Sequence, residues 1–269
     1  MQLIDGKKIQ KDILDDIKKE VATLTFQPVF CDVLVGADPA SMQYVRMKNK
    51  TAEDVGMKTK NAIFPENIST KNLIKEIKKL NEIENMCGII VQLPLPKHID
   101  THAVLNNIEK KLDVDTPSPA ALACMMVLDS LKINLVDKKI VVLGQGELVG
   151  KPVAELLKSR ELDFEIINSK TEEKEKLNLL KNADIIISGM GKGKYITSDM
   201  IKDGVVLIDA GTSESTGGMV GDVDLESVKD KASFVSPVPG GVGPVTVAML
   251  LKNVLQVAKS LTPTYSPHP

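Results

Sequence analysis

The chain has 269 residues, which leaves room for two domains, and a formal net charge of −2. Its composition, with 43% hydrophobic and 26% charged residues, is typical of a globular protein. This balance argues against nucleic acid as a partner, and the lack of Trp with only 3% aromatic residues leaves few platforms for stacking bases. No apolar run approaches the ~20 residues of a membrane span, and the first residues lack the apolar core of a signal peptide. We therefore expect a cytoplasmic protein that binds neither a membrane nor nucleic acid.

The three cysteines, Cys31, Cys87 and Cys124, are odd in number, far apart and never spaced as C-x-x-C. Only three histidines accompany them. This pattern predicts reduced thiols in or near the core and no metal site.

The N-terminal half alternates between patterns typical of helix and of strand. Apolar residues recur at helical spacing in some segments, and short apolar runs bounded by Gly, Pro or polar residues lie between them. Ser69 stands where an N-cap is expected. The pattern predicts helices over residues 7–24, 41–56, 69–80 and 100–108, and strands over residues 29–35, 61–64 and 87–91.

Tyr44 and Lys48 lie four residues apart on the expected second helix, so they share a face. Its apolar stripe, which includes Val45 and Ala52, is expected to lie on a different face. Tyr44 and Lys48 can therefore meet one ligand. The alternative is an ordinary helix surface on which Lys48 is one solvated lysine among many.

Polar residues follow the expected strand at 87–91. Gln92 comes directly after it, where the carboxyl ends of strands in α/β proteins form ligand sites. Asp115 lies further along, in a loop or at a strand end. Both are candidates for contact with a ligand.

A helix over residues 119–132 leads into the stretch at 139–157, which reads as strand, glycine loop and helix. Gly144, Gly146 and Gly150 allow backbone N–H groups to approach a phosphate, and the start of the new helix favours an anion. A dinucleotide pyrophosphate suits this site. The spacing is G-x-G-x-x-x-G, so a tight packing turn is the alternative.

Apolar runs recur after the glycine loop at 164–167, 185–187, 205–208 and 234–235, which predicts buried parallel strands joined by crossovers. Their carboxyl ends carry the segments 168–171, 189–191 and 209–211. The first of these reads Asn-Ser-Lys-Thr, without the acid that would bind a ribose 2′-hydroxyl. We therefore favour NADP over NAD as the cofactor.

The segment 236–244 is too rich in Gly and Pro for regular structure, and a strongly apolar helix is expected over 245–261. Its broad apolar face predicts packing against the first domain. The last residues, TPTYSPHP, are expected to be disordered.

Several stretches together resemble the bifunctional methylenetetrahydrofolate dehydrogenase/cyclohydrolase family. They are YVRMK at 44–48, GIIVQLPLP at 88–96, DVD at 113–115, GQGELVGKP at 144–152, NSKT at 168–171 and PVPGGVGPVT at 237–246. The resemblance implies an α/β fold with a Rossmann-type, doubly wound parallel sheet domain, a second α/β folate-binding and catalytic domain, and a cleft between them. We place the catalytic domain at 1–118, completed by the helix 245–262, the NAD(P)-binding domain at 119–244 and a disordered tail at 263–269.

The resemblance also implies an activity in one-carbon metabolism that serves purine biosynthesis. Members oxidise 5,10-methylenetetrahydrofolate with NADP or NAD, hydrolyse the methenyl product to 10-formyltetrahydrofolate, and are usually homodimers. The catalytic residues would be Lys48, Tyr44, Gln92 and Asp115. Tetrahydrofolate derivatives would contact Tyr44, Gln92, Leu93, Asp115, Pro239, Gly240 and Gly241. The cofactor would contact Gly144, Gln145, Gly146, Val149, Gly150, Ser169, Lys170 and Thr212.

The chemistry gives these residue types a role. Loss of hydride leaves a methenyl cation, and an ammonium beside it would raise the barrier by like-charge repulsion. A lysine kept partly neutral by burial avoids this, and Gln92 can orient its amine to assist water in attacking the cation.

The chain departs from the family pattern in two places. Members usually carry Gly-Arg-Ser where this loop reads Gly144-Gln145-Gly146, and a longer segment where Asp115 is followed almost directly by the next helix. Two alternatives therefore stay open. One is an enzyme with only one of the two activities, and the other is a catalytically silent protein that binds folate or nucleotide.

Overall fold

The computed structural model describes residues 1–215 and 218–261. The chain forms two compact units, the first made of Met1–Asp12 and Pro117–Met249 and the second of Ile13–Thr116 with the residues from Leu250 onward. Two of the boundaries between the units fall within helices, α1 (Gly6–Val21) and α9 (Val242–Leu261), and the third lies between Thr116 and Pro117. The tail predicted to be disordered, 263–269, lies outside the described residues.

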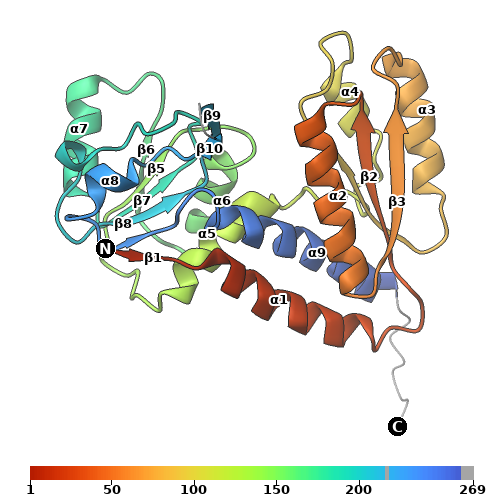
Figure 1. Cartoon of the computed structure of the whole chain (residues 1–269), viewed down its shortest axis with the longest axis horizontal. Helices are drawn as coiled ribbons and strands as arrows, with labels where there is room; N and C mark the ends of the chain where they lie inside the picture. Colours follow the sequence, from red (N-terminus) through yellow and green to blue (C-terminus); the bar gives the residue numbers. More distant parts are fainter. Residues whose placement is uncertain (216–217, 262–269) are drawn as a thin grey trace. The chain divides into compact units, whose positions relative to one another are not determined.

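The first unit contains a six-stranded sheet in which every pairing is parallel. Its order is β1-β11-β8-β7-β5-β6, and Figure 1 shows the central strands side by side. The strands of this sheet that follow in the chain from β5 onward have the doubly wound order that the glycine loop predicts. The strands are β1 (Gln2–Leu3), β5 (Ile140–Leu143), β6 (Phe164–Ile167), β7 (Ile185–Ser188), β8 (Val206–Asp209) and β11 (Phe234–Val235).

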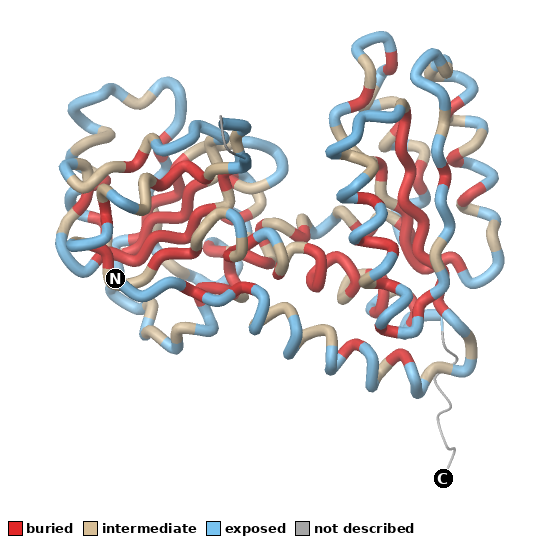
Figure 2. The backbone as a smooth tube through the Cα atoms, viewed as in Figure 1, coloured by how far each residue is buried: buried red, intermediate tan, exposed pale blue. Residues whose placement is uncertain are grey.

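Burial explains why the central strands are continuous apolar runs. Every residue of β5, β7 and β8 is buried, whereas the edge strand β6 exposes two of its four (Figure 2). Parallel strands covered on both faces need this composition. The helices of this unit are α5 (Pro119–Ser130), α6 (Gly150–Ser159), α7 (Glu173–Asn182) and α8 (Leu225–Val228), with a 3-10 turn at Ser198–Met200.

Two features of this unit differ from the sequence prediction. We placed residues 1–118 in one domain, but β1 pairs with β11: the Gln2 N–H donates to the Ser233 carbonyl at 2.8 Å. A strand of two residues is too short for an alternating pattern to show. The antiparallel pair β9 (Ser213–Ser215) and β10 (Gly218–Val220) was also missed, because strands of three residues are too short for an alternating pattern to show.

The second unit contains a three-stranded parallel sheet with the order β3-β2-β4. β2 is the central strand, and all seven of its residues are buried. The helices α2, α3 and α4 belong to this unit. The bounds are β2 (Val29–Val35), α2 (Pro39–Asp54), β3 (Lys58–Phe64), α3 (Thr70–Asn81), β4 (Met86–Val91) and α4 (Thr101–Leu105).

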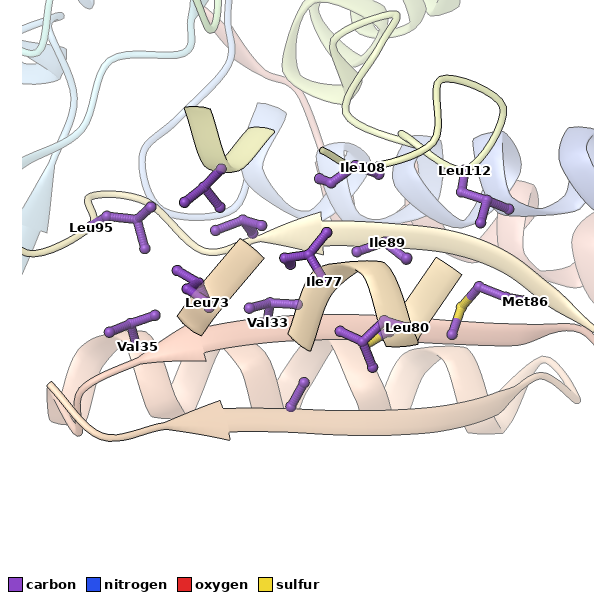
Figure 3. Packing of buried hydrophobic residues seen from close by; sticks show 14 of the residues in the cluster. Val33, Val35, Leu73, Ile77, Leu80, Met86, Ile89, Leu95, Ile108 and Leu112 are labelled. Carbon is purple, nitrogen blue, oxygen red and sulfur yellow. The ribbon is translucent and has the colours of Figure 1, made fainter. Parts of the chain in front are cut away.

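Alternation along β2 sends its side chains to two different cores. Val33 and Val35 join the cluster that receives Leu73 and Ile77 from α3, and Figure 3 shows these side chains pointing toward one another. Phe30 faces the other way, into a cluster with residues from α1, α2 and α9. In this second cluster the α9 side chains are Leu250, Leu251, Val254, Leu255 and Ala258, as the apolar pattern of the helix predicts.

The local signals for helix ends are mostly confirmed. Ser69 caps α3 and accepts a hydrogen bond from the Asn72 N–H. α2 starts earlier than predicted, since Pro39 is its first residue and Asp38 its cap. α4 is shorter than predicted and ends at Leu105.

The three cysteines are buried and free, as predicted. Burial raises the pKa of Cys31 and of Cys124 to about 12, and that of Cys87 to about 11. These thiols therefore stay protonated at neutral pH.

Within residues 1–215 and 218–261, no helix combines the length and the apolar character needed to cross a membrane.

Candidate active site

Lys48 lies on the buried face of α2. That face consists of Val45, Lys48, Asn49 and Ala52, which recur at helical spacing, and it packs over β2. Only 1% of Lys48 is exposed. The prediction that Lys48 lies away from the apolar stripe is wrong, and so is the alternative of a solvated lysine.

The amine of Lys48 has three neighbours in the second unit. Its Nζ donates to the Gln92 Oε1 at 3.0 Å, and it lies 4.9 Å from the centre of the Tyr44 ring. The third neighbour is Asp32, whose Oδ2 is 2.8 Å from Nζ. Three of the predicted catalytic residues are therefore in direct contact, together with an acid that sequence reasoning missed.

Asp32 stands in the middle of β2 and is fully buried. It shares the strand face of Phe30, so it points toward α2. Burial raises the pKa of Asp32, and the Lys48 charge opposes that shift. The signal that could have found it is an acid inside the apolar run VFCDVLV, because buried acids are rare without a partner.

Gln92 is held in one orientation. Its Nε2 donates to the carbonyl of Leu93 at 3.0 Å, which leaves Oε1 directed at Lys48. The amide thus accepts from the lysine rather than donating to it. Leu93 contributes to the site through its backbone.

Asp115 reaches the same region from the loop before α5. Asn253 on α9 donates to the Val114 carbonyl at 2.9 Å. Gly88 leaves room for the Val114 side chain, because a Cβ on Gly88 would be 2.8 Å from that side chain. Burial raises the pKa of Asp115, and the nearby Asp113 charge adds to this effect. Burial, with the charges of Asp32 and Asp115, raises the pKa of Tyr44 to about 12, so its hydroxyl is neutral.

The glycine loop of the first unit lies where the strand order reverses between β5 and β7. Gly144 has φ of +101°, and a Cβ there would be 2.9 Å from the Gly189 carbonyl. At Gly150 a Cβ would be 2.1 Å from the Gly144 carbonyl, whereas at Gly146 it would meet nothing within 4 Å. Gly144 and Gly150 therefore need glycine for the fold, while Gly146 leaves open space above the loop.

The start of α6 suits a phosphate. Val149 occupies its N-cap position, and no side chain among the described residues caps its N–H groups there. Gln145 is turned back, since its Nε2 donates to the Gly144 carbonyl. These features fit the pyrophosphate of a dinucleotide.

The segment after β6 folds into a turn without an acid. The Asn168 Oδ1 accepts from the Lys170 N–H, and the Thr171 hydroxyl accepts from the Asn168 N–H. Ser169 and Lys170 are exposed. In the same unit, Thr212 is exposed, and its carbonyl lies where a Cβ on Gly191 would be 3.5 Å away.

Pro239, Gly240 and Gly241 form the turn before α9 and belong to the first unit. The Gly241 N–H donates to the Pro237 carbonyl at 2.7 Å, and the Gly6 N–H donates to the Gly240 carbonyl at 3.0 Å. The turn is therefore fixed by backbone contacts with the start of α1.

A second pair of buried acids lies in the first unit. Asp209 accepts from the N–H groups of Gly211 and Val223 at 2.9 and 2.8 Å. Burial raises the pKa of Asp209 to about 6. Asp222 accepts from three donors, the Ser188 hydroxyl and the N–H groups of Met190 and Lys192.

Comparison with known proteins relates both units to one protein family. Residues 4–115 match the model of the tetrahydrofolate dehydrogenase/cyclohydrolase catalytic domain, and residues 118–262 match its NAD(P)-binding domain. The bifunctional protein FolD of Nautilia profundicola is 41% identical over 280 residues, covering 97% of this chain and 98% of the relative.

Two solved structures are similar over nearly the whole chain. The bifunctional FolD enzyme of Campylobacter jejuni has a TM-score of 0.91 at 34% identity, with 97% of this chain and 99% of that one covered. The methylenetetrahydrofolate dehydrogenase-cyclohydrolase of Trypanosoma brucei, solved with NADP and an inhibitor, has a TM-score of 0.90 at 33% identity, with coverages of 96% and 97%. From its sequence matches and its fold, this chain belongs to the tetrahydrofolate dehydrogenase/cyclohydrolase family.

Proposed function

We propose that Lys48 and the side chains around it carry out the chemistry that family membership implies. The chain oxidises 5,10-methylenetetrahydrofolate to the methenyl form with NADP, and it hydrolyses that product to 10-formyltetrahydrofolate. NADP, when bound, accepts the hydride. The residues of this chain bind and orient the folate and manage protons around it.

The observation that carries the proposal is the buried amine of Lys48. A lysine held by Gln92 and desolvated by α2 and β2 is fixed in position, and its neutral form can accept a proton from water. Tyr44 offers an aromatic face beside the amine for a flat ring of the folate. Asp115 offers a carboxyl group that can hold a pterin by hydrogen bonds.

The cofactor half of the proposal rests on the loop at 144–150 and the turn at 168–171. The uncapped start of α6 and the open space at Gly146 fit a pyrophosphate, with Gln145, Val149 and Gly150 shaping the loop. Ser169 and Lys170 offer a donor and a cation where an acid would repel a 2′-phosphate. We therefore expect a preference for NADP over NAD, with Thr212 near the cofactor. We propose that Pro239, Gly240 and Gly241 contact the folate.

One two-step assay tests the function. Wild-type protein should reduce NADP faster than NAD with methylenetetrahydrofolate, and should accelerate decay of the methenyl absorbance beyond the spontaneous rate. Lys48→Met should lose hydrolysis by about 10²–10⁴-fold, since a general base is removed. Hydrolysis at the wild-type rate by a folded Lys48→Met variant would refute the role of Lys48.

The same assay separates the alternatives. An enzyme with one activity would show only one of the two signals, and a silent binding protein would show neither. The chain passes from Asp115 to α5 within a few residues, so this is the place where an activity could have been lost.

We also propose, from the family resemblance, that the protein is a cytoplasmic homodimer that supplies formyl groups for purine biosynthesis. Light scattering after gel filtration measures the oligomeric state. A monomer at assay concentration would contradict the dimer.

A further inference from the structure

A buried ion pair, formed by Asp32 and Lys48, is unusual at the central strand of a small sheet. Both side chains are buried, at 0% and 1% exposure. Beyond the 2.8 Å contact with Nζ, the described residues give the Asp32 carboxylate no hydrogen bond of good geometry. A buried pair with so few hydrogen bonds contributes little to stability, and an apolar pair of the same size would do as well.

The position of the pair suggests a chemical use. Nζ is directed at once toward the Asp32 carboxylate and the Gln92 amide oxygen, and it lies over the Tyr44 ring. Asp32 is therefore the only acid in contact with the amine among the described residues. At Asp115 the Lys48 charge acts to lower the pKa, against the larger effect of burial.

One proton can sit at either end of this pair. Ammonium with carboxylate and amine with carboxylic acid both have a net charge of zero. A folate cation that approaches a lone ammonium meets a full like charge, whereas beside the pair it meets only a dipole. A cation near Nζ also favours the arrangement with the proton on Asp32.

We propose that Asp32 is a positioning residue that holds the Lys48 amine in place and takes up its proton when the methenyl cation binds; this rests on the proposed function of Lys48. An Nζ–H bond breaks and an Oδ2–H bond forms. The oxygen of water then bonds to the methenyl carbon while one of its O–H bonds breaks and the proton moves to Nζ. The hydrated carbon next breaks its bond to the folate N5, which takes a proton as the hydroxyl loses one. The Oδ2–H bond then breaks and its proton passes to solvent, which restores the ion pair, so the sum is one water consumed and one proton released.

The proposal makes a distinctive prediction for pH dependence. Because the proton moves within the pair, wild-type hydrolysis should change little between about pH 6 and about pH 8.5, once the spontaneous rate is subtracted. In Asp32→Asn the amine must lose its proton to solvent. Its rate should be roughly tenfold or more below wild type at the acid end and should rise with pH.

The other groups that face the pair do not produce this difference. Tyr44 on α2 and Cys31 beside Asp32 each have a pKa raised, chiefly by burial, to about 12, so both stay neutral. Lys60 on β3 acts on Cys31, and Asp113 acts on Asp115. In Asp32→Asn the Asp32 charge that adds to both shifts is gone, but burial, the larger cause, remains, so Tyr44 and Cys31 stay neutral and a new pH limb reports Lys48.

Asp129→Asn is the matched control. It removes an acid from another ion pair, with Arg160, in the first unit, and it should keep the wild-type pH profile. Circular dichroism confirms that each variant is folded. If Asp32→Asn does not fold, the pH profile of wild-type hydrolysis tests the proposal alone. A tenfold rise in the wild-type rate between about pH 6 and about pH 8.5 contradicts proton transfer within the pair.

The outcomes distinguish a failure of the role of Asp32 from a failure of the proposed function. An Asp32→Asn variant with wild-type rate and profile, or with a loss that does not depend on pH, overturns the role of Asp32 while Lys48→Met stays inactive. An active Lys48→Met overturns the proposed function itself.

Discussion

The two units bury their acids in different ways. In the first unit, the Asp209 and Asp222 carboxylates accept from backbone N–H groups and, at Asp222, from the Ser188 hydroxyl. In the second unit, Asp32 has a lysine and no other close donor among the described residues. The first arrangement satisfies the oxygens with fixed dipoles, whereas the second places a single charged amine beside them.

The partners of each acid indicate which one is structural. Asp222 ties Ser188, at the end of β7, to the loop that follows, so its hydrogen bonds hold the shape of the sheet edge. Within the described part of the chain, Asp32 contacts the side chain of Lys48 and ties no loop in place. A buried acid that fixes a single amine is suited to chemistry more than to architecture.

The largest effect should come from separating the ion pair. Lys48→Met and Asp32→Val each leave a buried charge without its partner, so each should cost about 3–5 kcal/mol of unfolding free energy. The double variant leaves two apolar side chains and should lie within about 1 kcal/mol of wild type. Urea denaturation of the four proteins measures this cycle.

Additive losses of unfolding free energy in the double variant would contradict this expectation. They would mean that Asp32 and Lys48 each support the fold through contacts other than their pairing. The unfolding slope with urea should stay constant across the four proteins, since a change would signal altered denatured states.

The next effect concerns Asp209 and pH. Its pKa of about 6, against an ordinary value of 3.8, corresponds to about 3 kcal/mol. Because the folded state binds this proton more tightly, the contribution is fully present below about pH 4 and is lost as the pH rises through about 6. The unfolding free energy of wild type relative to Asp209→Asn should therefore fall by about 3 kcal/mol over that range.

Chemical denaturation at several pH values follows this difference. A difference that does not change between about pH 4 and about pH 7 would show that the N–H groups around Asp209 fully offset its burial. Asp209 would then be ionised like a surface acid.

The smallest effect comes from the glycine beside Asp222. A methyl group on Gly211 would lie 2.1 Å from the Asp222 carboxyl carbon, so Gly211→Ala must displace a carboxylate held by three donors. We expect a loss of about 1–3 kcal/mol. Gly146→Ala is the control, since its methyl would meet nothing within 4 Å.

Thermal melts compare the two alanine variants. Equal melting temperatures would show that the Asp222 carboxylate can move aside at little cost. Its three hydrogen bonds would then not fix the loop, and Asp222 would no longer differ from Asp32 in this respect. Gly146→Ala is also expected to bind NADP more weakly than wild type, because its methyl occupies the space left for the pyrophosphate.

Much of the fold could be predicted from patterns that are local. The apolar run of β2, the N-cap at Ser69 and the broad apolar face of α9 each act within a few residues. Elements that depend on distant partners could not be predicted. β1 has two residues and becomes a strand only because β11 lies beside it.

The site was predicted in part for the same reason. The resemblance identified Tyr44, Lys48, Gln92 and Asp115, and the structure brings the first three into contact. It could not identify Asp32, because the pairing of a strand residue with a helix residue sixteen positions away depends on how α2 packs over β2. The glycine pattern likewise did not distinguish Gly146, which has free space, from Gly150, which has none.

The pairing of β1 with β11 also sets an order of events during synthesis. Gln2 pairs with Phe234, so β1 can join its sheet only after about 230 further residues have been made. The strands β2, β3 and β4, in contrast, lie within Val29–Val91 and can pair early. Since contacts between distant residues form slowly, the six-stranded sheet should be the late step of folding.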